Sequence, residues 1–219
     1  MEDSIYKLAN ILMVVGFSIF LLHMIIKYVA SKIDIKEKNI STEIETKISE
    51  LKLETKLILH EDKCSPLYDQ SEDTIEIENK STFTLFCSAF HELGHAYFNK
   101  YSNIVKYTKG NTLVERKQTN KEHRYFLTVV IVLLGISAIT LYFNKFASIG
   151  FSTLAATLFL SDLREEFMSS ISAVNMIKVS KYFTKKQEHM CCLYLISLLG
   201  TYMYVFFIAI CLILYNIFY

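Results

Sequence analysis

The sequence predicts a mainly α-helical integral membrane protein with four transmembrane helices and a small cytoplasmic α+β segment. Of its 219 residues, 52% are hydrophobic, and the mean hydropathy is +0.30, which is more apolar than an ordinary soluble domain. The apolar residues are gathered into four blocks rather than spread along the chain. Between the blocks, helical and strand periodicities in polar segments predict folded structure outside the membrane.

The first block, Leu8–Val29, predicts an N-terminal transmembrane anchor over residues 1–30. Only Asn10, His23 and Lys27 interrupt its apolar run. A cleaved signal peptide would instead have a basic leader, a shorter apolar core and a small-residue cleavage site. We therefore expect the segment to be retained as an anchor.

The other three blocks predict a transmembrane hairpin over residues 126–160 and a C-terminal transmembrane helix over residues 190–219. All three blocks lack charged residues. The block Phe146–Leu160 is short, since a spanning helix needs about 20 apolar residues. It is expected either to extend through Asp162 or to follow a tight turn at Asn144 and Lys145.

The positive charge predicts the orientation of the chain. Apart from Lys7 and Lys145, every lysine and arginine lies in residues 27–125 or 161–190. Because positively charged flanking segments stay on the inner side of the membrane, we expect a cytoplasmic segment over 31–125 and a cytoplasmic helix over 161–189. The sequence contains no nucleic-acid-binding motif, so the expected partners are the lipid bilayer and a peptide or protein.

The segment over residues 31–125 has its own pattern of secondary structure. Helical spacing of apolar residues gives way to alternation and then to helical spacing again. The expected elements are a helix near 40–51 capped by Ser41 or Thr42, a strand near 55–60, a loop over 64–73, a strand over 74–78 and a helix over 81–99. The two strands are expected to form a hairpin, and the second is expected to align an extended peptide by edge pairing.

The helix over 81–99 carries the sequence His91-Glu92-Leu93-Gly94-His95. Residues four apart share one face of a helix, and two neutral imidazoles at this spacing bind one Zn²⁺. Glu92 then lies beside the metal, where a general base is needed. Gly94 costs about 1 kcal/mol of helix propensity relative to alanine, so we expect close packing against it. The alternative is a surface helix with two solvated histidines.

A catalytic zinc site of this type needs a third protein ligand. That ligand must lie on the same side of the membrane as the motif, and two predicted helices return the chain to that side at residues 161–170. Asp162, Glu165 and Glu166 are the acidic candidates there. Their chemistry alone does not choose among them.

Two segments carry a resemblance to a known family. They are His91-Glu92-Leu93-Gly94-His95-Ala96 and Glu166-Phe167-Met168-Ser169-Ser170. They are similar to the His-Glu-x-Gly-His-Ala and Glu-Phe-x-Ala-Ser segments of the YugP-like family, the membrane-bound neutral zinc metallopeptidases of bacteria. The resemblance implies that His91, His95 and Glu166 hold zinc and that Glu92 activates water. It also implies peptide hydrolysis at the bacterial plasma membrane, and the distribution of positive charge predicts that the site lies on the cytoplasmic side.

One position departs from the family pattern, and another departs from the pattern of a wider group. Ser169 stands in place of the usual alanine, and Ser170 stands where the wider group of membrane zinc peptidases often has an aspartate. A supporting carboxylate is therefore expected from elsewhere, for example Asp162. The departures leave room for a catalytically inactive membrane adaptor or immunity-type protein. A site-2-type intramembrane protease is a further alternative, although Pro66 is the only proline and no Asn-Pro pair is present.

Overall fold

The structure is a computed structural model that describes residues 2–35, 39–62, 64–107, 120–140, 143–180 and 182–218. Within these ranges the side chains of residues 2–6, 102–107, 120–128, 161–162 and 218 are not described. The chain forms two compact units. The helical unit comprises Met1–Ile25, His123–Arg164 and Ser197–Tyr219, and the mixed unit comprises Ile26–Glu122 and Glu165–Ile196.

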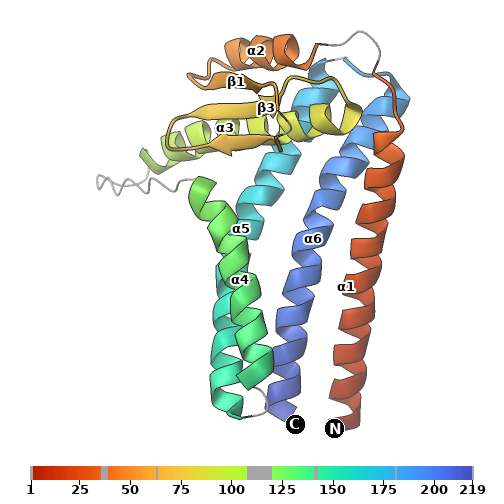
Figure 1. The fold of residues 1–219 in the computed structure, drawn as a ribbon, viewed down its shortest axis with the longest axis vertical. Helices are drawn as coiled ribbons and strands as arrows, with labels where there is room; N and C mark the ends of the chain where they lie inside the picture. Colours follow the sequence, from red (N-terminus) through yellow and green to blue (C-terminus); the bar gives the residue numbers. More distant parts are fainter. Residues whose placement is uncertain are drawn as a thin grey trace. The chain divides into compact units, whose positions relative to one another are not determined.

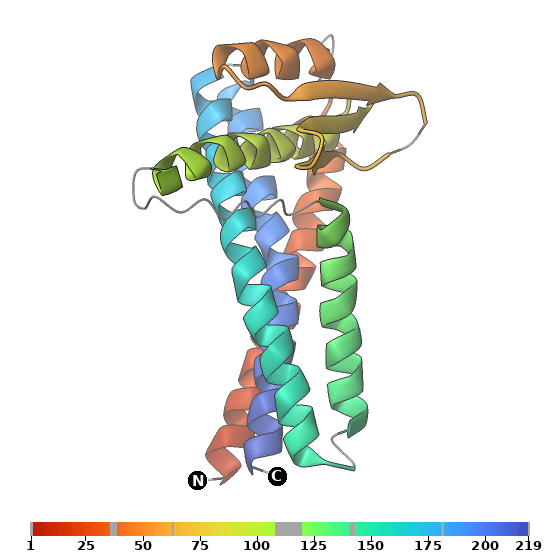
Figure 2. The ribbon, with the colours of Figure 1, turned by 90° about the vertical axis from the view of Figure 1, so that its left-hand side faces the viewer.

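The helical unit is formed by four of the described helices, each of which continues into the mixed unit. They are α1 (Glu2–Ser31), α4 (Asn120–Thr140), α5 (Lys145–Ser180) and α6 (Lys185–Phe218). Val130 of α4, Phe159 of α5 and Ala209 of α6 belong to one buried apolar cluster. Helix α1 lies antiparallel beside α6, and the two chain ends are neighbours (Figures 1 and 2). Phe20 and Tyr204 stack between these two helices, with ring centroids 5.4 Å apart.

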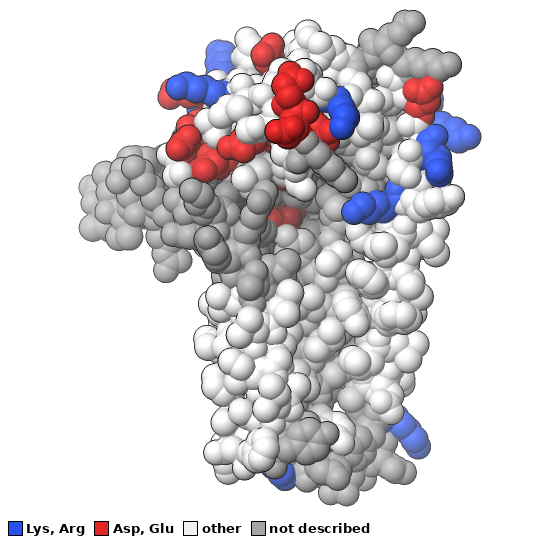
Figure 3. Space-filling view, in the orientation of Figure 1, with Lys and Arg blue, Asp and Glu red and all other residues white. Residues whose placement is uncertain are grey.

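Three of the described helices contain an apolar stretch long enough to cross a membrane. These stretches are Lys7–Ser31, Lys145–Ser180 and Lys185–Ile217. In the described part of α4 the apolar stretch, Val129–Thr140, is shorter, so the expected number of four is corrected to three for the described residues. The surface of the helical unit visible in Figure 3 is almost uncharged, whereas charged side chains gather over the mixed unit.

Helix α5 extends well beyond the short apolar block that predicts it. It runs without interruption from Lys145 to Ser180. The sequence contains no glycine or proline between Phe151 and Ser180, so nothing in it stops the helix after Leu160. The extension through Asp162 is therefore confirmed.

The mixed unit combines a small sheet with helices α2 and α3. Its elements are α2 (Ile40–Glu50), β1 (Lys56–His60), β2 (Leu67–Asp69), β3 (Thr74–Glu78), α3 (Phe83–Tyr107) and the adjoining parts of α5 and α6. Helix α3 contacts β2, β3 and α2 (Figure 1). Ile44 of α2, Ile75 and Ile77 of β3, and Phe90 of α3 are at most 1% exposed. The apolar face of α3 thus forms the core of this unit together with β3.

The predicted hairpin of strands 55–60 and 74–78 is wrong. These strands, β1 and β3, pair in parallel, and the sheet order is β1-β3-β2. The strand antiparallel to β3 is β2, which lies in the expected loop. With only three residues, β2 is too short for an alternating pattern to be recognised. Because β1 pairs along the whole of β3 and β2 pairs with Thr74–Glu76, β3 is the central strand, and the expected edge pairing along residues 74–78 is wrong as well.

The helix boundaries also differ from expectation. Asn39 caps α2 rather than Ser41 or Thr42, because its Oδ1 accepts from the Ser41 backbone N–H at 3.0 Å. Thr82 caps α3 in the same way, since its Oγ1 accepts from the Leu85 N–H at 3.3 Å. Helix α3 continues to Tyr107, two turns past its expected end.

Candidate metal centre

Helix α3 supplies the two histidines of the site. Its most buried side chains include Phe86, Phe90 and Leu93, each 0% exposed, and the rings of Phe86 and Phe90 stack with centroids 5.1 Å apart. His91 follows directly on this apolar face and is 6% exposed. His95 lies one turn later, and its side chain is 18% exposed. The apolar face therefore fixes the helix while the two imidazoles point to one common position.

Helix α5 supplies an acidic group to the same position. A Cβ atom built at Gly94 would lie 2.3 Å from the Ser169 carbonyl oxygen, so only glycine allows α5 to approach α3 this closely. Glu166 lies one turn before Ser170 on α5 and is 5% exposed. The expected close packing at Gly94 is confirmed, and its consequence is that Glu166 reaches the histidines.

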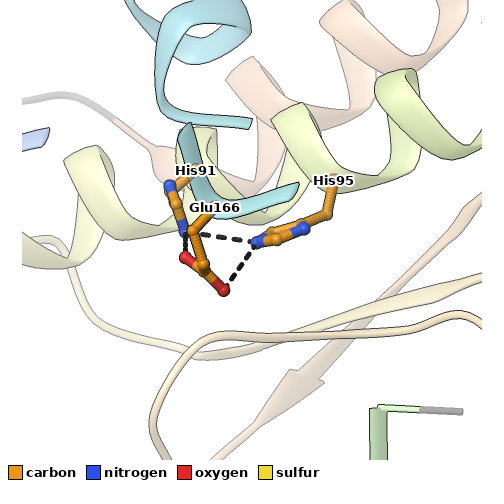
Figure 4. A group of neighbouring side chains, drawn as sticks. All are labelled: His91, His95 and Glu166. Carbon is orange, nitrogen blue, oxygen red and sulfur yellow. Dashed lines mark hydrogen bonds and ion pairs between the residues drawn. The ribbon is translucent and has the colours of Figure 1, made fainter. Parts of the chain in front are cut away.

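His91, His95 and Glu166 converge on one another (Figure 4). His91 Nε2 lies 3.0 Å from Glu166 Oε2, and His95 Nε2 lies 3.5 Å from Glu166 Oε1. The two Nε2 atoms are 3.2 Å apart. One ligand atom from each residue lies within 4.8 Å of the other two, and this set could hold a metal ion. The spacing of His91 and His95 predicts their part of this cluster, and the family resemblance predicts Glu166 as the third member.

The charge of Glu166 governs the protonation of His95 in the absence of a metal. Burial alone would lower the pKa of His95, but the hydrogen bond and charge of Glu166 outweigh burial and raise it from 6.5 to about 9. The carboxylates of Glu92 and Glu165 act in the same direction. The proton on His95 thus balances the negative charge of Glu166, and a bound cation could take its place.

The other candidates for the third ligand lie apart from this group. Glu165 is exposed and does not belong to the cluster. The side chain of Asp162 lies outside the described residues, as does its expected role as a supporting carboxylate. Among the described residues, Glu166 is therefore the acidic member of the cluster.

Glu92 lies beside the cluster and is held by the sheet. Its Oε2 accepts a hydrogen bond from the Tyr68 backbone N–H in β2, at 2.9 Å. This contact is absent from the sequence-based prediction, because residues 64–73 were expected to form a loop. The turn-forming Pro66 could have indicated that a strand begins after it. With only three residues, however, β2 is too short to show the alternating pattern by which strands are recognised.

Tyr68 is itself anchored by a polar network. Its hydroxyl donates to Asp73 Oδ1 at 2.9 Å and accepts from Asn99 Nδ2 at 3.1 Å. Thr55 Oγ1 also donates to Asp73 Oδ1, at 2.7 Å. Burial and the neighbouring Asp73 raise the pKa of the Tyr68 hydroxyl, so it remains a donor at neutral pH. Because Glu92 and Asn99 both lie on α3, two contacts fix β2 against this helix.

Comparisons with known proteins found no match for this chain. No family model matches the chain, and no curated protein and no solved structure matches it either. The residues that the structure describes thus contain a buried His91/His95/Glu166 cluster that could hold a metal ion and three apolar helices of membrane length.

Proposed function

We propose that this protein is a membrane-bound zinc-dependent metallopeptidase. In this proposal His91, His95 and Glu166 hold Zn²⁺, and Glu92 is the general base. The observation that carries it is the convergence of two imidazoles and one carboxylate at a buried position, with the charge of a further carboxylate, Glu92, acting on His95. A catalytic zinc site has this composition, with three protein ligands and one position left for water or substrate.

The distances in the cluster support zinc. Tetrahedral Zn²⁺ with bonds of 2.0–2.1 Å places neighbouring ligand atoms about 3.3–3.4 Å apart. The two Nε2 atoms are 3.2 Å apart, and each lies near a different oxygen of Glu166, His91 at 3.0 Å from Oε2 and His95 at 3.5 Å from Oε1. When bound, zinc would polarise the scissile carbonyl and lower the pKa of the attacking water.

The residues around the cluster have separate tasks in this proposal. One oxygen of Glu92 is engaged by the Tyr68 N–H, which keeps the carboxylate in a fixed orientation. The other oxygen accepts the proton of the attacking water, and Glu92 then passes this proton to the leaving amine. Since the Tyr68 N–H bonds to Glu92, it faces the outer edge of β2, away from β3.

Two alternative functions receive less support. A site-2-type intramembrane protease carries its motif on an apolar spanning helix, whereas α3 is not among the described helices of membrane length and composition. An inactive adaptor would not need a complete set of ligands, yet Glu92 and all three cluster residues are present. The positive charge of residues 27–125 and 161–190 supports a cytoplasmic site at the plasma membrane.

The first test is the metal content of the detergent-purified full-length protein. We expect about one zinc per chain, lost in Glu166→Ala and retained in Asp162→Ala, because Glu166 is the acidic residue that joins the two histidines among the side chains that the structure describes. Elemental analysis of the three proteins measures this. Zinc lost only in Asp162→Ala would move the third ligand, and no zinc in the wild type after metal-replete purification would favour the adaptor.

The second test concerns the base. Glu92→Gln keeps the side-chain volume and an oxygen that accepts from Tyr68 but removes the basic carboxylate, so zinc content should be unchanged. Hydrolysis of casein should fall by about 10²–10⁴-fold, the usual contribution of a general base. Full activity in a Glu92→Gln protein of normal zinc content would contradict the role assigned to Glu92.

A further inference from the structure

The two ring nitrogens of His91 face different partners. Nε2 lies 3.0 Å from Glu166 Oε2 and 3.2 Å from His95 Nε2, so it faces the candidate metal position. Nδ1 lies 3.3 Å from the hydroxyl of Ser170, one turn after Glu166 on α5. Since the two nitrogens of a neutral imidazole share a single proton, the partner of Nδ1 decides whether Nε2 is free to bind a metal.

The second contact of Ser170 fixes the direction of these hydrogen bonds. Its Oγ lies 3.5 Å from the backbone carbonyl of Leu195 in α6, and a carbonyl only accepts. Ser170 therefore donates its one hydrogen to Leu195 and accepts the Nδ1–H of His91. When a metal is bound, this order leaves the lone pair of Nε2 for the metal, whereas in the metal-free structure Nε2 donates to the Glu166 carboxylate, which only accepts. Ser170 is 2% exposed, so water does not compete for its hydroxyl.

We infer that Ser170 is a positioning residue of the metal site, which selects the Nδ1–H tautomer of His91 and connects this ligand to α6. The inference rests on the proposed metal-binding function. It assigns to a neutral hydroxyl the task for which the sequence predicts a carboxylate. Because the hydroxyl is uncharged, the site gains an oriented ligand without a further buried negative charge.

The neighbouring serine provides a matched control. Ser169 is also buried, at 0% exposure, and lies on the same turn of α5, but its Oγ has no hydrogen-bond partner among the described residues. Ser169→Ala and Ser170→Ala therefore remove the same hydroxyl from adjacent buried positions. Only Ser170→Ala removes a contact to His91.

The test measures metal affinity rather than hydrolysis. Full-length wild type, Ser169→Ala and Ser170→Ala are titrated in detergent with Co²⁺ against a competing chelator, and the visible absorption of bound Co²⁺ is recorded. We expect Ser170→Ala to bind Co²⁺ about 10–100-fold more weakly, with an altered spectrum, as for other supporting partners of metal ligands. Ser169→Ala should stay within about twofold of the wild type, since its hydroxyl supports no ligand.

Equal affinities for all three proteins, or equal losses in both variants, would overturn the inference while the metal site stands. A wild type that binds neither Co²⁺ nor Zn²⁺ would overturn the proposed function and the inference with it. If Ser170→Ala does not fold, ¹⁵N-histidine NMR of the zinc-loaded wild type decides the question. It should show the Nδ1 proton of His91 hydrogen-bonded and protected from exchange with water, and an Nδ1 proton that exchanges freely would contradict the contact with Ser170.

Discussion

The carboxylate of Glu166 keeps His95 protonated at neutral pH in the metal-free protein. Since the pKa of His95 rises from 6.5 to about 9 on folding, protonated His95 contributes stability fully below pH 6.5. That contribution is lost as the pH rises through about 9. We therefore predict that the melting temperature of the chelator-treated protein falls between these two pH values. Thermal unfolding followed by circular dichroism at a series of pH values measures this.

Glu166→Gln is the control for this pH dependence. It removes the negative charge that raises the pKa of His95 but keeps the size of the side chain. Its melting temperature should change much less over the same range of pH. A wild-type melting temperature that is constant or rises from pH 6.5 to 9 would contradict the predicted coupling.

Some residues of the site can be predicted from the sequence, and others cannot. The spacing of His91, Glu92 and His95 defines their common face, because it depends only on the geometry of one helix. Glu166 lies 75 residues away from His91, and its selection over Glu165 depends on the rotation of α5 against α3. The contacts of Tyr68 and Ser170 are tertiary, so no local pattern reports them.

At the scale of elements, the contact between α3 and α5 is the one that closes the site. Gly94→Ala would raise helix propensity by about 1 kcal/mol at an exposed position. Here the new Cβ would lie 2.3 Å from the Ser169 carbonyl oxygen, and backbone atoms cannot rotate away. The steric cost of this clash should exceed the gain in helix propensity. We therefore predict a net destabilisation of about 1–3 kcal/mol, as for overpacked cores, together with weaker zinc binding.

Gly135→Ala provides the control for the glycine substitution. Gly135 lies within α4, and a Cβ atom built there has no neighbouring atom within 4 Å, so an alanine meets no obstacle. Thermal unfolding and zinc content of the two variants are measured side by side. Gly135→Ala should be neutral or slightly stabilising. A Gly94→Ala protein with wild-type stability and zinc content would show that α5 can shift without cost.

The elements themselves could be predicted more reliably than their pairing. Apolar spacing locates α2, β1, β3 and α3, because each is long enough to show a period. The parallel pairing of β1 with β3 could not be predicted, since it depends on β2 occupying the other edge of β3. Helix α5 exceeds its apolar block because helix formation continues through polar residues such as Arg164 and Glu165.

At the scale of the whole molecule, composition predicts the membrane helices but not their number. The uncharged block Phe126–Phe143 is of spanning length in the sequence, and the part of it whose side chains the structure describes, Val129–Thr140, is shorter than a membrane span. The division into two units follows instead from the charge distribution, which separates apolar blocks from charged segments.

The candidate metal site couples binding to the folding of the whole mixed unit. Its ligands come from α3 and α5, so the site exists only when both helices are packed. A metal that binds the folded state alone stabilises it by about 2.7 kcal/mol at a free concentration of 100 times Kd. We therefore predict that the melting temperature of the wild type rises steadily with buffered free Zn²⁺ above Kd and falls when the metal is chelated. Glu166→Ala should not respond over the same range, and a wild type equally insensitive to Zn²⁺ would exclude a native metal site.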